Sequence, residues 1–87
     1  MLTFEYDQDK SLSNKDKHGI DFETAEQLWL DPLLAEIPAN TNDEPRFLLI
    51  GRISDKHWSA IITYRNDNIR IISVRRSRLK EVEIYES

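Results

Sequence analysis

The chain has 87 residues and no cysteine, which excludes disulfides, thiolate zinc sites and a cysteine nucleophile. Its only glycines are Gly19 and Gly51, so the sequence contains no glycine-rich loop of the kind that cradles a nucleotide phosphate. The only histidines, His18 and His57, lie far apart and lack the spacing of a metal-binding pair. We therefore expect neither a metal site nor a nucleotide cofactor.

Long apolar segments are also missing. No run approaches the roughly 18 residues that a membrane-spanning helix requires. The opening sequence MLTFEYDQDK has neither the basic nor the apolar region of a secretory signal. These features predict a cytoplasmic protein without a membrane partner. The length predicts a single domain, residues 1–87, with a small core.

Charge is strongly segregated along the chain. Residues 1–45 carry three lysines and eleven acids, a balance of -8, whereas residues 46–87 carry nine basic residues and five acids, a balance of +4; together they give the net charge of -4. The basic residues of the second half are Arg46, Arg52, Lys56, Arg65, Arg70, Arg75, Arg76, Arg78 and Lys80. Arginine binds phosphate with a planar fork of donors, so nucleic acid is the first candidate partner. The alternative is that these side chains are solvated or paired with acids.

The first half is expected to be mainly helical. Residues 2–6 alternate apolar and polar and predict a short strand, and Asp7 then caps a polar surface helix that Gly19 ends. A second helix begins after Asp21 and ends at Pro32, followed by a strand over 33–38. The apolar stripe of this second helix is Phe22, Ala25, Leu28 and Trp29.

The second half predicts an antiparallel meander over residues 46–53, 58–65 and 69–75, with turn-forming residues between the segments. Strand periodicity places Arg70 and Arg75 on opposite faces of the last strand. A closing helix over Ser77 to Tyr85 presents Leu79, Val82 and Tyr85 as its apolar stripe. The expected fold class is α+β, with N-terminal helices, an antiparallel meander and a C-terminal helix, all helices lying on one side of the sheet.

Motifs distributed over the whole chain resemble the BrnT toxin family. They are Phe4-Glu5-Tyr6-Asp7, Lys10, Asn14, Lys17-His18-Gly19, Phe22-Glu23, Ala25, Asp31-Pro32, Arg46, Ile50-Gly51, Thr63, Arg65, Ile69-Arg70-Ile71-Ile72-Ser73, Arg75, Glu81 and Tyr85. The resemblance implies a RelE-like fold and a type II toxin that cleaves RNA, arrests growth and is neutralised by a BrnA-like antitoxin. In that family the antitoxin carries the ribbon-helix-helix element, so DNA is contacted only indirectly through it.

Cleavage of RNA without a metal requires a 2′-hydroxyl to lose a proton, the phosphate charge to be stabilised and the leaving oxygen to gain a proton. We expect Arg65 and Arg75 to stabilise the phosphate, converging on it with Arg70, and His18 with Lys17 to serve in proton transfer and charge stabilisation. The expected RNA-binding residues are Arg46, Arg70 and Arg76.

Each of these assignments has a structural alternative. Arg70 is placed equally well to pair with Glu81 or Glu5 and fix the sheet, and His18 before Gly19 is placed to cap a helix end. At the level of the whole chain, the alternative is a non-catalytic interaction module, a degenerate toxin whose arginines bind an antitoxin or another acidic partner.

Overall fold

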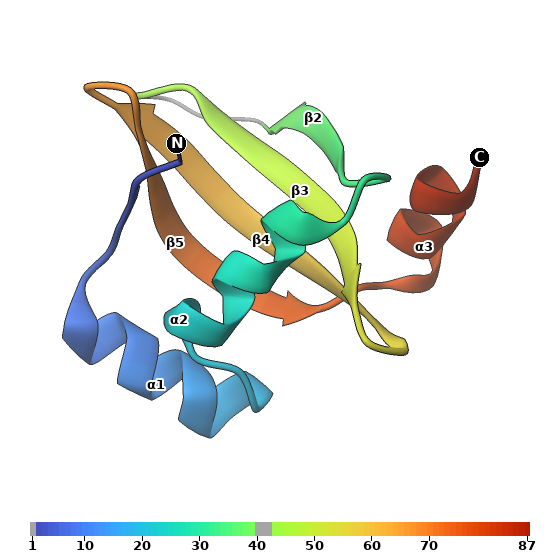
Figure 1. The fold of residues 1–87 in the computed structure, drawn as a ribbon, viewed down its shortest axis with the longest axis horizontal. Coiled ribbons are helices and arrows are strands. Elements are labelled where there is room, and N and C mark those ends of the chain that lie inside the picture. The colour runs from blue at the N-terminus through green and yellow to red at the C-terminus, as the bar shows by residue number, and fades with distance from the viewer. Residues whose placement is uncertain (1, 40–42) are drawn as a thin grey trace.

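The computed structural model describes residues 2–39 and 43–87 as an α+β fold (Figure 1). Its elements in chain order are β1 (Phe4–Glu5), α1 (Gln8–His18), α2 (Phe22–Ala25), the 3-10 helix η1 (Glu26–Leu30), β2 (Ala35–Ala39), β3 (Arg46–Ile53), β4 (Lys56–Arg65), β5 (Asn68–Arg76) and α3 (Leu79–Glu86). The predicted α+β class is confirmed. The predicted strand over 33–38 lies two residues later than expected at its start, as β2. No described helix is long and apolar enough to cross a membrane.

The five strands form one sheet in the order β1-β5-β4-β3-β2. Strands β2 to β5 pair antiparallel, which confirms the predicted meander. The short strand β1 instead pairs in parallel with β5, placing Glu5 beside Arg70. The sheet is therefore mixed rather than purely antiparallel, because β1, the first strand of the chain, runs in the same direction as its neighbour β5.

Helix α1 has the ends that the sequence predicts. The Asp7 carboxylate accepts a hydrogen bond from the Lys10 backbone N–H, and Gly19 ends the helix with φ of 81°, a left-handed conformation that favours glycine. Its exposed Leu12 agrees with the expected surface position. The side that packs on the protein is polar, since Ser11 and Asn14 are its buried residues.

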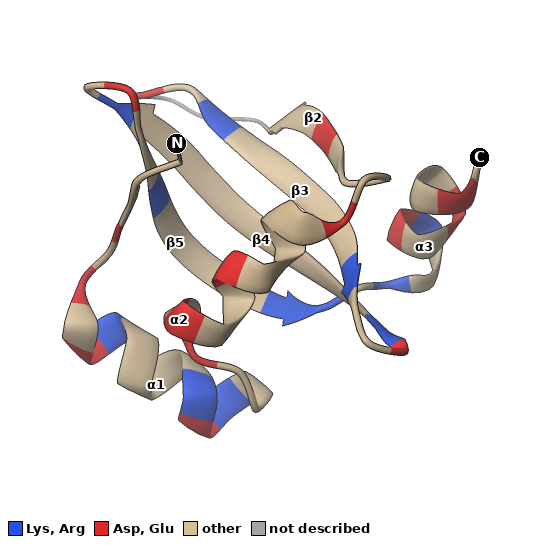
Figure 2. Ribbon diagram, in the orientation of Figure 1, with Lys and Arg blue, Asp and Glu red and all other residues tan. Residues whose placement is uncertain are grey.

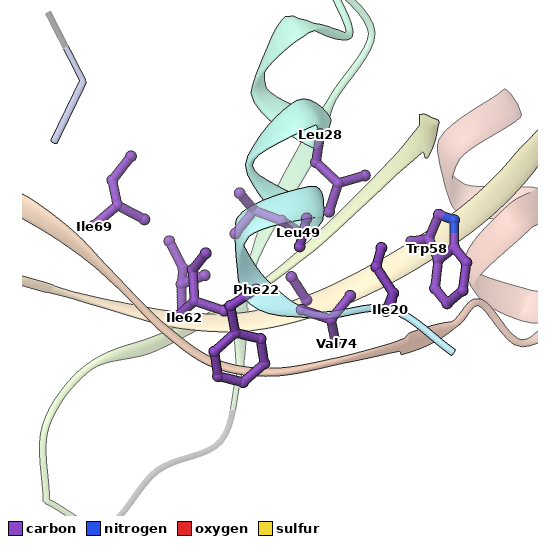
Figure 3. Close-up of a cluster of buried hydrophobic side chains, with 11 residues drawn as sticks. Ile20, Phe22, Leu28, Leu49, Trp58, Ile62, Ile69 and Val74 are labelled. Atoms are coloured by element: carbon purple, nitrogen blue, oxygen red, sulfur yellow. The ribbon is translucent and has the colours of Figure 1, made fainter. Parts of the chain in front are cut away.

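The main core lies between the sheet and the segment formed by α2 and η1 (Figure 3). Phe22, Ala25 and Leu28 are buried as the predicted stripe requires, although the second half of the expected α-helix is the 3-10 helix η1. On the sheet, Leu49, Ala60 and Val74 are register partners on this face. A side chain at Gly51 would place its Cβ 2.9 Å from Leu34 Cδ1, so glycine permits the close approach of the chain here.

Helix α3 packs differently from expectation. Ile50, Ser59 and Arg75 are register partners that point away from the main core, and Glu81 of α3 bonds to the last two of them. The helices therefore cover both faces of the sheet, not one. The expected stripe is corrected at one position: Leu79 is 76% exposed, whereas Val82 and Tyr85 are half-buried and Glu81 is the buried residue of α3. The Arg75–Glu81 pair links the start of this helix to β5, and the Tyr85 hydroxyl donates to Asp31 nearer its end.

Candidate functional site

A hollow of about 210 Å³ lies between α1 and the outer edge of β5. It is lined by Lys10, Ser13, Asn14, Lys17, His18, Ile72 and Ser73. Among the described residues that line this hollow, three have basic side chains and none has a carboxylate. Cations and hydroxyl groups around a small space provide the interactions that a phosphate group requires. The sequence prediction of Lys17 and His18 thus places two candidates in one site, to which the structure adds Lys10 and Ser73.

Helical geometry explains why the basic residues meet. Lys10, Asn14 and Lys17 recur at the spacing of successive helical turns, so they share one side of α1. This periodicity was a usable signal for Lys10 that the sequence prediction of site residues missed. Ser73 belongs to the motif Ile69-Arg70-Ile71-Ile72-Ser73, but no spacing in the sequence places it beside α1, because that position depends on packing between distant segments.

Asn14 fixes α1 against β5. Its side-chain amide donates to the carbonyl oxygens of Ile20 and Val74 at 2.8 and 2.9 Å, and its Oδ1 accepts from the Val74 N–H at 3.2 Å. All three bonds are buried. Because Lys17 and His18 lie within one turn of Asn14, these bonds also hold the hollow in shape.

A β-bulge changes the expected face of Arg70. Ile61 pairs with Ser73 while Ile62 pairs with Ile71, so Ile72 is an extra residue on β5. As a result Arg70, Ser73 and Arg75 all project from the same face. Their partners are alternate residues of β4, namely Thr63, Ile61 and Ser59. The expected opposite placement of Arg70 and Arg75 is wrong, because strand periodicity cannot anticipate an inserted residue.

Arginines from three strands gather at one end of this face. Arg65 donates to both carboxylate oxygens of Glu44, at 3.3 and 3.1 Å, and Arg46 and Arg70 add to the positive potential around the same carboxylate. These contacts lower the pKa of Glu44, chiefly through its hydrogen bonds with Arg65. Arg70 also lies 3.9 Å from Glu5, which is one of the two acidic partners expected for it.

Arg75 lies apart from this group. Its partner Ser59 is four residues from Thr63 along β4, which corresponds to about 13 Å in a strand. Arg65 and Arg70 both lie near Glu44, but Arg75 is too far along the sheet for all three arginines to bind one phosphate. Its guanidinium instead donates two hydrogen bonds of 2.8 Å to Glu81. The hydrogen bonds from Arg75 are the main reason that the pKa of Glu81 falls to about 2.

The remaining predicted residues occupy other environments. Arg76 lies over the ring of Trp58 at 5.5 Å, on the face that carries the main core. His57 is half-buried, packs against the ring of Tyr85 and lies 3.8 Å from Glu86. His18 is exposed in the last turn of α1, where a basic residue suits the helix end, and it also lines the hollow.

The site therefore consists of a basic hollow at the edge of β5 and a neighbouring sheet face that carries Arg65 and Arg70. No curated protein sequence matches the chain at a significant level. A family profile described as "Ribonuclease toxin, BrnT, of type II toxin-antitoxin system" matches residues 6–81, which is most of the chain. This chain belongs to the BrnT family of ribonuclease toxins of type II toxin-antitoxin systems.

Proposed function

We propose that this chain is a metal-independent endoribonuclease, that RNA crosses the edge of β5, and that the reaction takes place at the hollow beside α1. The observation that carries the proposal is the meeting of Lys10, Lys17 and His18 in a hollow whose described lining residues include no carboxylate. The single strand of RNA would continue over the sheet face that carries Arg65 and Arg70. Phosphate contacts of this kind position a nucleic acid without selecting its sequence.

The residues of the hollow have complementary tasks in the proposed reaction. The imidazole of His18 takes the proton from the attacking 2′-hydroxyl and gives a proton to the leaving oxygen, since imidazole both accepts and donates protons near neutral pH. The ammonium groups of Lys10 and Lys17 stabilise the charge that grows on the phosphate. Ser73 donates a hydrogen bond to a phosphate oxygen and fixes its orientation.

The arginines act around this centre. Arg65, Arg70 and Arg46 hold neighbouring phosphates, and their pairs with Glu44 and Glu5 open when RNA binds. Arg75 is two residues from Ser73 on the same strand face, so it faces the RNA only if it exchanges Glu81 for a phosphate. Its first task in the proposal is to anchor α3. Arg76 contributes long-range attraction from the neighbouring face.

Control of the enzyme completes the proposal. A ribbon-helix-helix antitoxin of the BrnA type neutralises the chain, and growth arrest follows when the antitoxin is lost. The membership in a type II toxin-antitoxin family supports an antitoxin partner. The resemblance of the motifs to BrnT supports the BrnA type, which also carries the DNA contact of the pair.

The decisive experiment compares neighbouring lysines of one helix. Lys17 lines the hollow, whereas Lys15 lies on the same exposed helix outside it, so Lys15→Ala is a matched control for Lys17→Ala. With purified protein, EDTA and a labelled single-stranded RNA, we expect His18→Ala and Lys17→Ala each to reduce cleavage by about 100-fold. Lys15→Ala is expected to cleave as the unaltered chain does.

Three results would count against the proposal. Cleavage abolished by EDTA and restored by a divalent ion would reject the metal-independent reaction. Equal cleavage by the Lys17 and Lys15 variants would reject the hollow. RNA that binds and stays intact, with normal growth after induction without antitoxin, would favour the non-catalytic module, a reading to which the carboxylate pairing of Arg65 and Arg75 lends some support.

A further inference from the structure

A second concave surface is formed by residues of the acidic first half of the sequence. Its groove of about 460 Å³ runs between the N-terminal strand and η1, where Leu2, Phe4, Trp29 and Leu30 provide its apolar lining. A second hollow of about 420 Å³ adjoins it and shares Gln27 and Leu30 as lining residues. Leu30 is 82% exposed and Leu2 is 57% exposed. Exposed leucines beside two hollows indicate a surface that a partner covers.

Carboxylates at the rim specify the charge of that partner. Glu23 and Glu26 line the groove, and none of the described residues that line it has a basic side chain. Figure 2 shows acidic residues grouped along α2 and at the start of η1, the 3-10 helix that follows it. Within residues 2–39 and 43–87, neither Glu23 nor Glu26 forms a salt bridge. Burial and repulsion by Glu23 raise the pKa of Glu26, so a nearby cation would be favourable.

These features exclude RNA as the occupant, because two carboxylates repel a phosphate backbone. They fit a helical peptide that combines apolar side chains on one face with lysine or arginine beside them. We propose that this groove is the docking site of a cationic amphipathic segment of the antitoxin. The segment covers Trp29 and Leu30 with its apolar face and pairs its cations with Glu23 and Glu26. The identity of the partner as an antitoxin rests on the proposed function.

In the part of the chain that the structure describes, the groove and the proposed catalytic hollow share no lining residue. Antitoxin binding and RNA cleavage are therefore separable by mutation. Groove variants are expected to cleave RNA normally and to escape the antitoxin. Hollow variants are expected to lose cleavage and to bind the antitoxin normally. This double separation distinguishes a failure of the docking proposal from a failure of the proposed enzyme.

The test measures the affinity of the cognate antitoxin for the chain by calorimetric titration. All binding variants are prepared with His18→Ala, so that the protein accumulates without the antitoxin. The double variant Glu23→Lys, Glu26→Lys is expected to weaken binding at least 100-fold, and Leu30→Ser about tenfold. The matched controls are Glu83→Lys and Leu12→Ser, which alter an exposed acid and an exposed leucine away from the groove. Both are expected to bind within twofold of the reference.

Higher salt is expected to weaken binding of the reference chain more than that of the double lysine variant. Unchanged affinity in both groove variants, with thermal unfolding equal to the controls, would overturn the proposal. Tighter binding by the double lysine variant would show an acidic partner segment and would also overturn it. Sedimentation that reveals self-association lost in Leu30→Ser would assign the groove to a second copy instead.

Discussion

Arg75 and Glu81 form a bidentate ion pair with both N···O distances at 2.8 Å. The same carboxylate accepts hydrogen bonds from the Ser59 hydroxyl and the Arg78 backbone N–H. One buried acid thereby joins β4, β5 and the start of α3. Such an arrangement makes the position of the C-terminal helix depend on the charge of a single residue.

The first prediction concerns acid stability. The pKa of Glu81 is lowered from its ordinary 4.5 to about 2, so this carboxylate stabilises the fold above pH 4.5 and loses that contribution as the pH falls towards 2. The shift corresponds to an upper value of about 3 kcal/mol. Urea unfolding of Glu81→Gln at pH 7 should show most of this loss, with a smaller fall in stability between pH 4.5 and 2 than the unaltered chain.

Glu83→Gln on the same helix is the control, because Glu83 is exposed. It should unfold as the unaltered chain does throughout the pH range. Identical pH profiles for the Glu81 variant and the unaltered chain would disprove the assigned role of this carboxylate.

The second prediction separates two arginines that the sequence suggested for the same task. Arg75→Ala leaves the largely buried Glu81 without its cation and should lower the free energy of unfolding by about 2 kcal/mol. Arg65→Ala removes an exposed pair with Glu44 and should leave thermal unfolding unchanged. A loss of activity in the Arg65 variant therefore reports on RNA, whereas one in the Arg75 variant has to be corrected for folding. Equal melting temperatures of the two variants would contradict this division.

The third prediction concerns the amide between α1 and β5. Asn14→Ala leaves the Ile20 carbonyl and both backbone groups of Val74 without their side-chain partner, and should lower the free energy of unfolding by about 2–3 kcal/mol. Ser13→Ala, at the exposed position just before Asn14 on the helix, should have little effect on chemical denaturation. If the two variants unfold at the same urea concentration, the three bonds do not hold α1.

The fourth prediction tests the close approach at Gly51. An alanine there would place its Cβ 2.9 Å from Leu34 Cδ1 and 3.1 Å from Leu28 Cδ2, so Gly51→Ala should cost about 1–3 kcal/mol in unfolding free energy. Leu34→Ala in the same chain removes the nearest atom and should recover part of the loss. No recovery in this double variant would show that Leu34 is not the obstacle.

Local signals in the sequence predicted most of the secondary structure. Asp7 and Gly19 mark the ends of α1 because caps act within one turn, and turn-forming residues separate β3, β4 and β5 for the same reason. The burial of Asn14 has no such signal. A polar helix is expected to face water, and this one packs through bonds to Val74, 60 positions further along the chain.

The sequence predicted individual residues of the candidate site, but not which of them lie side by side in the folded chain. Lys17 and His18 were identified from their motif, but their neighbour Ser73 is brought to them only by the packing of α1 on β5. The inserted Ile72 then decides which arginines share a face. Bulges and long-range pairs depend on tertiary structure, so a pattern of alternating residues does not reveal them.

The sheet has two outer strands, and an outer strand can pair with another chain and start aggregation. Pro38 in β2 has no N–H to offer such a partner. At the opposite side, β1 covers β5 at residues 69 and 70, and the Asn14 amide occupies the backbone groups of Val74 further along. A side chain that holds a helix in place therefore also denies an incoming strand its hydrogen bonds, which helps this small protein resist association through its edges.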